Sequence, residues 1–129
     1  MADTSLAKKL VIKPHYHILL LNAPQGYRAH MGELPEGVTV TTLGEGPFDM
    51  VQAFAEQRAG LEELAPLAIR AVKPDGLLWL TYPKKTGKIA SDLSREVTWE
   101  VLVPHRWHPV TQISIDETWS ALRFRPDEK

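Results

Sequence analysis

The sequence predicts one α/β domain in which helices cover both faces of a mainly parallel sheet, with an antiparallel strand pair at the C-terminal edge. Three observations predict this three-layer α/β/α class. Short apolar segments alternate with helical segments, as they do when helices connect parallel strands. The last two apolar segments are joined by a turn that is too short for a helical crossover. The length of 129 residues suits a single domain over residues 1–129.

The first half of the chain predicts two short helices and three strands. Thr4 or Ser5 caps a helix that ends near Leu10, because the chain then approaches a proline. An apolar run predicts a strand that is buried on both faces. The elements after the first helix are expected as a strand at 15–21, a turn at 22–26, a short helix at 27–31, and strands at 38–42 and 48–54.

The second half begins with a helix from about residue 56 to 72, where apolar residues recur at helical spacing. Pro66 either kinks this helix or separates two shorter ones. Residues 73–76 (KPDG) predict a helix stop and a tight turn. Trp79 and Trp99 are expected in the core. The remaining elements are expected as a strand at 77–82, a basic loop at 83–88, a helix capped by Ser91 or Asp92 that reaches about residue 103, and strands at 110–115 and 118–125.

Composition excludes several classes of function. A net charge of −1 argues against binding nucleic acid or an anionic membrane through a broad basic surface. Without cysteine the chain has no disulfide, no thiolate zinc site and no cysteine nucleophile. The sequence shows no signal-peptide pattern and no apolar run long enough to span a bilayer, so a cytoplasmic protein is expected.

Part of the sequence resembles a known enzyme family. Residues 48–51 (FDMV), a helix closing in LAIRAVKPDG at 67–76 and the strand LLWLTYPK at 77–84 are similar to the second half of class I S-adenosylmethionine-dependent methyltransferases. The strand pair within 110–125 resembles their C-terminal hairpin. The resemblance implies a Rossmann-like, methyltransferase-like fold.

Over nearly its full length the chain also resembles a small bacterial family classed as a domain of unknown function. The shared stretches are SLAKKL at 5–10, LLLNAPxGY at 19–27, PKK at 83–85 and DETWS at 116–120. This second resemblance implies a Rossmann-like fold and brings no assigned activity with it.

The first half of the chain departs from the methyltransferase pattern. Residues 22–26 (NAPQG) stand where those enzymes carry a glycine-rich loop that approaches the cofactor. Thr42 ends the second strand where an acidic residue usually holds the ribose, and Glu45 is a displaced candidate. Too few residues separate Leu21 from Phe48 for the usual helix, strand and helix. The sheet is therefore expected to be truncated on the strand-2/3 side, by at least one strand.

A ligand site is predicted at the carboxyl ends of the strands. In open α/β sheets ligands bind where the strand order reverses, which here lies between the first strand and the Phe48 strand. The competing interpretation is that residues 22–26 only supply the turn that a buried strand needs. The predicted ligand-binding residues are Asn22, Gln25, Gly26, Tyr27, Tyr82, Lys84 and Lys85, with Phe54 and Glu56 delivered to the same place.

Two further clusters have both a structural and a functional interpretation. Lys84, Lys85 and Lys88 precede a helix N-terminus, where amines and free amides bind phosphate or carboxylate, but a solvated basic loop has the same composition. The turn at 116–120 brings two carboxylates together. It is interpreted as a turn with Trp119 packed on the sheet, because adjacent side chains diverge.

Histidine pairs do not lead to a metal site. His15 and His17 share one face of a strand, and His105 and His108 flank a tryptophan, but neither pair has an evident third ligand. No metal site is therefore predicted.

Two hypotheses for function follow. The first is a non-catalytic, cofactor-free domain on a degenerate methyltransferase-like scaffold that binds a small molecule near Asn22, Tyr27 and Tyr82, or another protein chain, including a second copy in a homodimer. The alternative is an S-adenosylmethionine-dependent methyltransferase with an atypical cofactor pocket. No set of residues identifies catalytic groups, so the sequence does not decide whether the protein is an enzyme.

Overall fold

A computed structural model describes residues 5–127 as one six-stranded sheet flanked by helices, with the strand order β2-β1-β3-β4-β6-β5. No helix in this described range is long and apolar enough to cross a membrane. The strands are β1 (His17–Leu21), β2 (Thr39–Thr41), β3 (Phe48–Phe54), β4 (Val72–Pro83), β5 (Trp107–Ser114) and β6 (Trp119–Pro126). The helices are α1 (Leu6–Lys9), α2 (Tyr27–Met31), α3 (Arg58–Ala71), α4 (Arg95–Leu102) and the 3-10 helix η1 (Val103–His105).

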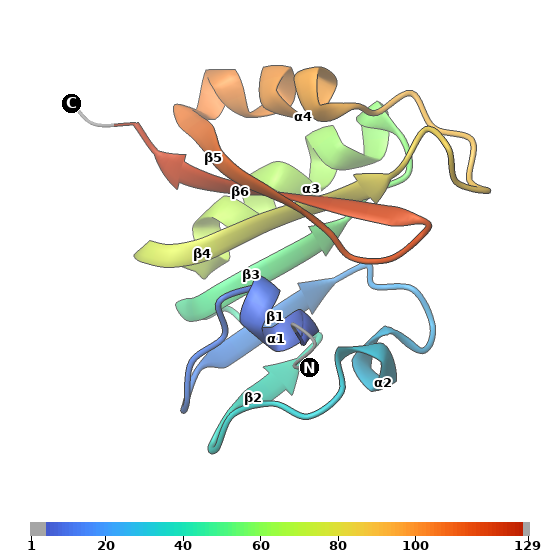
Figure 1. Ribbon diagram of the computed structural model, residues 1–129. Coiled ribbons are helices and arrows are strands. Elements are labelled where there is room, and N and C mark those ends of the chain that lie inside the picture. Colours follow the sequence, from blue (N-terminus) through green and yellow to red (C-terminus); the bar gives the residue numbers. More distant parts are fainter. Residues whose placement is uncertain (1–4, 128–129) are drawn as a thin grey trace.

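The sheet is parallel at one side and antiparallel at the other. Strands β2, β1, β3 and β4 run parallel, whereas β6 pairs antiparallel with both β4 and β5. In Figure 1, α1 and α2 lie on one face of the sheet, and α3 and α4 cover the other. The strand order reverses between β1 and β3, as the sequence predicted. This confirms the predicted three-layer, mainly parallel fold with a terminal antiparallel pair.

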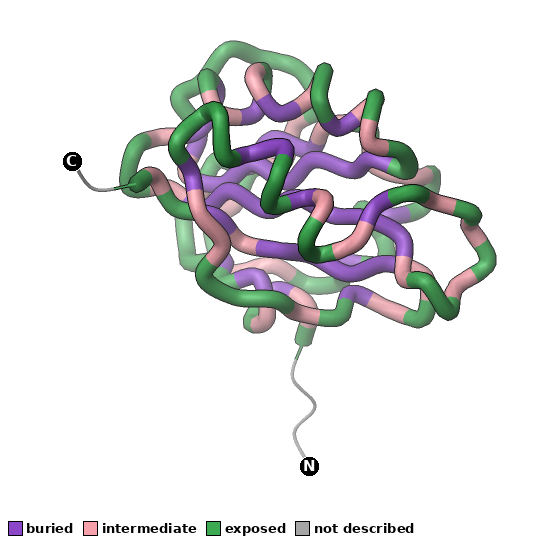
Figure 2. The backbone as a smooth tube through the Cα atoms, turned by 90° about the horizontal axis from the view of Figure 1, so that it is seen from above, coloured by how far each residue is buried: buried purple, intermediate pink, exposed green. Residues whose placement is uncertain are grey.

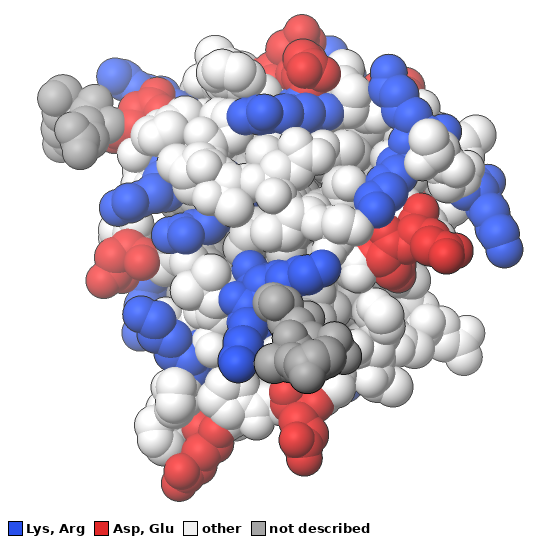
Figure 3. All heavy atoms as spheres, in the orientation of Figure 1, with Lys and Arg blue, Asp and Glu red and all other residues white. Residues whose placement is uncertain are grey.

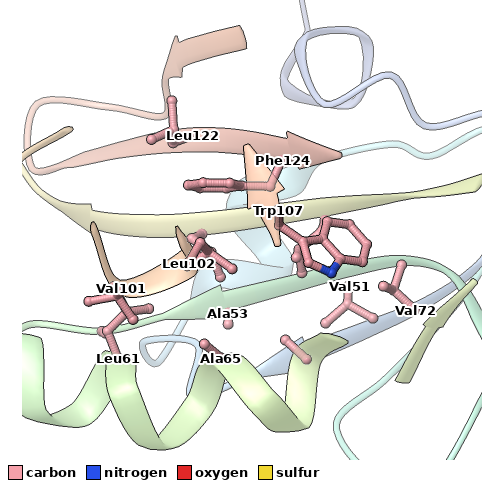
Figure 4. Packing of buried hydrophobic residues seen from close by; sticks show 14 of the residues in the cluster. Val51, Ala53, Leu61, Ala65, Val72, Val101, Leu102, Trp107, Leu122 and Phe124 are labelled. Carbon is pink, nitrogen blue, oxygen red and sulfur yellow. The ribbon is translucent and has the colours of Figure 1, made fainter. Parts of the chain in front are cut away.

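Alternation along the strands divides the core into two clusters. On β4, Leu78, Leu80 and Tyr82 point toward α3 and α4, while Leu77 and Trp79 point toward α1 and α2. Figure 2 shows the buried residues concentrated along the central strands. Figure 4 shows the first cluster, in which side chains of α3 and α4 pack onto the sheet. Burial of both faces explains why the central strands are almost continuously apolar.

Helix ends differ from those that the sequence predicts. The N-cap of α4 is Ser94, whose side chain accepts a hydrogen bond from the Val97 amide at 3.1 Å, rather than Ser91 or Asp92. Asp92 instead accepts a bond from the Arg58 amide at 2.7 Å, at the start of α3. The prediction was wrong because an Asp can cap any helix N-terminus within its reach. Tertiary folding brings the N-terminus of α3, rather than that of α4, to Asp92.

The junction between α3 and β4 also corrects the sequence prediction. The helix continues through Pro66 as one element and ends at Ala71. Residues 73–76 do not form a turn before the strand but belong to β4. They bulge from the ladder, because Phe48 pairs with Val72 while Met50 pairs with Leu77.

Only one of the two tryptophans expected in the core is there. Trp79 is fully buried, whereas Trp99 is 44% exposed on α4. Trp99 occupies a helix position that faces away from the sheet, so the expectation for Trp99 was wrong.

The sheet is truncated at its β2 edge, as predicted. β2 ends at Thr41 and β3 begins at Phe48, so only residues 42–47 connect these parallel strands. Such crossovers usually take a dozen or more residues and include a helix. Within residues 5–127, β2 is the only strand beyond β1, and no helix lies between β2 and β3 in the chain. Leu43 in this connection is 82% exposed.

Asp49 ties three segments together at the start of β3. Its carboxylate accepts a bond from the Lys73 ammonium at 2.7 Å and from the His17 amide at 2.8 Å. Burial raises the pKa of Asp49, but the hydrogen bonds from Lys73 and His17 outweigh burial and hold it below the ordinary value. The ionised form is therefore the one that stabilises the fold.

Asp49→Asn is expected to lower the free energy of unfolding by about 1–2 kcal/mol at neutral pH, a value reduced for the partial exposure of Lys73. Because the folded pKa lies below the unfolded one of about 3.9, this contribution is present above that pH and is lost as the pH falls through the folded value. Urea denaturation of wild type and variant across acid pH measures the difference. A difference that stays constant down to the lowest pH contradicts the expectation.

Candidate functional site

The loop after β1 lies at the carboxyl ends of the strands. Asn22 has a left-handed backbone conformation with φ of 61°, and its side-chain amide donates to the Phe54 carbonyl at 2.9 Å. This bond joins the ends of β1 and β3. Gln25 and Gly26 are exposed, and Gly26 has a φ of 86° that favours glycine. In this loop Asn22 stabilises the turn that follows β1, which agrees with the turn interpretation.

Tyr27 begins a buried chain of hydrogen bonds beneath this loop. Its hydroxyl donates to Gln52 Oε1 at 2.9 Å, and Gln52 Nε2 donates to Thr81 Oγ1 at 3.0 Å. Burial raises the pKa of Tyr27 far above its ordinary value, so its hydroxyl stays protonated and donates. The chain therefore links α2, β3 and β4 through groups that are satisfied by one another.

Aromatic side chains fill the crevice at the reversal of strand order. The rings of Tyr27 and Phe54 lie 4.7 Å apart, and those of Phe54 and Trp119 lie 5.4 Å apart, both edge to face. A hollow of only about 180 Å³ remains beside Gln25, Gly26 and Tyr27. This end of the predicted site is thus largely occupied by the protein itself.

Tyr82, Lys84 and Lys85 lie at the other end of the predicted site. The Tyr82 side chain belongs to the cluster on the α3 and α4 face, whereas Tyr27 belongs to the cluster on the α1 and α2 face. The sheet therefore separates Tyr27 from Tyr82, which the sequence predicted to line one crevice. Whether either group binds a ligand stays a prediction.

A hollow of about 290 Å³ opens beside Tyr82, between the carboxyl end of β4 and the start of α4. Figure 3 shows Lys and Arg side chains gathered at this edge of the molecule, over the loop that follows β4. The hollow is lined by Tyr82, Pro83, Lys84, Lys85, Thr86, Leu93, Ser94, Arg95, Glu96, Gln112 and Ser120.

Sequence reasoning missed Arg95 and Ser120 as members of this group. Arg95 was expected inside a helix, and Ser120 where the turn at 116–120 overlaps the strand at 118–125. Ser120 lies directly opposite Tyr82 in the β4–β6 ladder. Only the strand pairing brings Ser120 and Tyr82 together. The signal in the sequence was a serine inside an otherwise apolar C-terminal strand.

The turn at residues 116–120 has the structural role that its sequence indicates. Asp116 Oδ1 accepts bonds from the amides of Thr118 at 2.8 Å and Trp119 at 2.9 Å. Trp119 packs into the core. Asp116 is therefore a turn-forming residue, as expected for an Asp at the first position of such a turn.

A larger groove of about 490 Å³ lies between β1, the connection at residues 42–45 and the last turns of α3. Leu19, Leu21 and Leu67 supply apolar surface. Glu45 and Arg70 add one charge of each sign. In the range 5–127, no group of three or more His, Asp or Glu side chains is arranged to hold a metal ion.

Comparison with known proteins identifies the fold and finds no related sequence. No family model matches the chain, and no curated protein matches it in sequence. Solved structures do match it. A ribosomal protein L11 methylase from Lactobacillus delbrueckii subsp. bulgaricus superposes with a TM-score of 0.63 at 11% identity, covering 95% of this chain and 75% of that one.

Two further structures agree. A TehB-like SAM-dependent methyltransferase from Corynebacterium glutamicum matches with a TM-score of 0.60 at 13% identity, covering 97% of this chain and 89% of that one. A complex of DhpI with SAH matches with a TM-score of 0.63 at 13% identity, covering 96% and 81%. The resemblance to a small bacterial family stays a prediction. The chain has the Rossmann-like fold of S-adenosylmethionine-dependent methyltransferases, in a truncated form.

Proposed function

We propose that this protein binds S-adenosylmethionine in the groove beside β1 and acts as a methyltransferase with an atypical cofactor pocket. The observation that carries the proposal is the groove itself, which combines an apolar wall with one acid and one base next to the ends of β1 and β2. Its volume of about 490 Å³ falls within the range of about 300–1,000 Å³ that small-molecule sites occupy. The structural neighbours named above include methyltransferases and a complex with the demethylated product.

The loop after β1 does not fit this cofactor in the usual way. The Asn22 side-chain amide is hydrogen-bonded to the Phe54 carbonyl. The rings of Tyr27, Phe54 and Trp119 fill the crevice beneath the loop. The hollow of about 180 Å³ that remains there is smaller than the range of about 300–1,000 Å³ that small-molecule sites occupy.

The groove beside β1 fits the chemistry of the cofactor better. Leu21 and Leu67 offer apolar surface to an adenine ring. The Glu45 carboxylate is suited to accept bonds from ribose hydroxyls, and the Arg70 guanidinium to bind an α-carboxylate. When bound, the cofactor would supply a methyl group for transfer to a nucleophile. The groove is open to solvent along residues 42–45, so a second substrate has access to it.

Calorimetric titration with S-adenosylmethionine and with S-adenosylhomocysteine tests the proposal. We expect binding in the micromolar range and a thermal shift, since a ligand that binds only the folded state stabilises it. Glu45→Gln is expected to weaken binding about tenfold, because it removes a charged acceptor. Leu67→Asp is expected to weaken it further by placing a charge in the apolar wall.

The matched control is Glu63→Gln, the same change on an exposed position of α3 outside the groove, which should bind like wild type. No binding of either compound at millimolar concentration would overturn the proposal. Binding that is equally strong in the Glu45 and Leu67 variants would place the cofactor elsewhere and overturn the groove assignment.

One observation favours a second candidate function, the non-catalytic domain. The filled crevice beneath the first loop is what a scaffold without a cofactor is expected to have, because a core that binds nothing packs to native density. The same titration decides between the candidates, since the non-catalytic domain should bind neither compound.

A further inference from the structure

We propose that the hollow between Tyr82, Ser120 and the N-terminus of α4 binds the phosphate group of a small organic phosphate. The residues that line this hollow are all different from those that line the groove beside β1. The inference therefore goes beyond the proposed cofactor site, and neither depends on the other.

Two hydroxyls of largely buried residues reach the hollow and have no protein partner among the described residues. Tyr82 and Ser120 are only 5% and 7% exposed, and both line it. They lie directly opposite each other on β4 and β6. Neither hydroxyl forms a hydrogen bond with any residue in the range 5–127. Because both hydroxyls open only to the hollow's solvent, a ligand with several acceptor oxygens could accept a bond from each.

The Tyr82 hydroxyl is in the right form to donate. Burial raises the pKa of Tyr82, and the positive charge of Arg95, which acts in the opposite direction, does not cancel that effect. At neutral pH the group is therefore protonated and serves as a donor to an anion.

The charge of the lining matches a phosphate monoester. Lys84, Lys85 and Arg95 contribute three positive charges and Glu96 one negative charge, so the lining carries about +2. A phosphate monoester carries about −1.5 to −2 at neutral pH. Among the described residues, Arg58 forms the ion pairs with carboxylates of α3 and α4. Arg95 is therefore available to bind an anion in the hollow.

Backbone groups add to these side chains. Ser94 caps α4 by accepting from the Val97 amide, while the amides of Arg95 and Glu96 in the first turn have no partner within the helix. They lie at the positive end of the helix dipole. Lys84 is held beside the hollow by a bond from its ammonium to Ser114 Oγ at 2.6 Å. Ser114 in turn lies opposite Ser120 on β5.

The test is an NMR titration of the full chain with glycerol phosphate at physiological salt, following backbone amide shifts. Glycerol and acetate are titrated in parallel. We expect saturable shifts at residues 82–86, 94–97 and 120 with glycerol phosphate only. Arg95→Gln and Tyr82→Phe should each weaken binding about tenfold, because each loses a bond to a charged acceptor. Tyr82→Phe keeps the ring and its packing, so this variant remains folded.

Arg28→Gln is the matched control, because Arg28 is an exposed arginine on α2 at the opposite face, and it should bind like wild type. Equal affinity of the Arg95 variant and the control would overturn the proposal, as would shifts that never saturate. Acetate that binds as tightly as glycerol phosphate would overturn the phosphate assignment and identify a carboxylate site.

Discussion

Trp79→Ala is expected to lower the free energy of unfolding by about 3–5 kcal/mol, enough to leave the domain barely folded. Trp79 is fully buried in the middle of β4, within the cluster that α1 and α2 cover. Its indole Nε1 donates to the Leu10 carbonyl at 3.1 Å. The substitution therefore creates a large cavity and also frees the end of α1 from the sheet. Urea denaturation followed by circular dichroism measures the loss.

Two variants separate these contributions. Trp79→Phe keeps most of the ring but removes the bond to Leu10, and should cost less than the alanine variant. Trp99→Ala, at a site that is 44% exposed, should change the stability by no more than about 1 kcal/mol. A loss for Trp79→Ala as small as that for Trp99→Ala would contradict the packing of the α1 face.

Gln52→Leu is expected to cost about 2–4 kcal/mol, although it replaces a polar residue by an apolar one in the core. Gln52 is fully buried in β3, between the hydroxyls of Tyr27 and Thr81. The leucine leaves the Tyr27 hydroxyl without its acceptor and the Thr81 hydroxyl without its donor. Unpaired buried groups carry the full cost of losing water.

The triple variant Tyr27→Phe, Gln52→Leu, Thr81→Val provides the control. It removes every member of the hydrogen-bond chain while keeping the shapes similar, so stability should return to within about 1–2 kcal/mol of wild type. The non-additivity between single and triple variants is the quantity to measure, by urea denaturation of each. Additive losses would show that the three groups do not act as one network.

The two halves of the predicted ligand site now have different meanings. The half around Asn22 and Tyr27 is packed and hydrogen-bonded within the protein. The half around Tyr82 and Lys85 faces a hollow with unpartnered hydroxyls and a positive lining. The groove beside β1 is a third surface, which exists because residues 42–47 replace a longer connection.

The sequence alone determined the fold class and most element positions. The strand at 48–54 and the helix at 27–31 occur with the predicted bounds. These predictions rest on local periodicity and on the length of the connections. Both are local properties of the sequence and do not depend on contacts between distant segments. The short segment between Leu21 and Phe48 likewise determined that the sheet is truncated.

Only the tertiary structure decided which polar groups meet. Asp92 serves α3 and not the helix that follows it, and Ser120 stands opposite Tyr82 because of the antiparallel register of β4 and β6. Tyr27 of α2 and Tyr82 of β4 also lie on opposite faces of the sheet, although both lie near the carboxyl ends of the strands. For Tyr82 and Ser120 the physical reason is that side chains alternate between faces along a strand. One residue of register therefore decides to which face a group belongs, and pairing between distant segments sets that register.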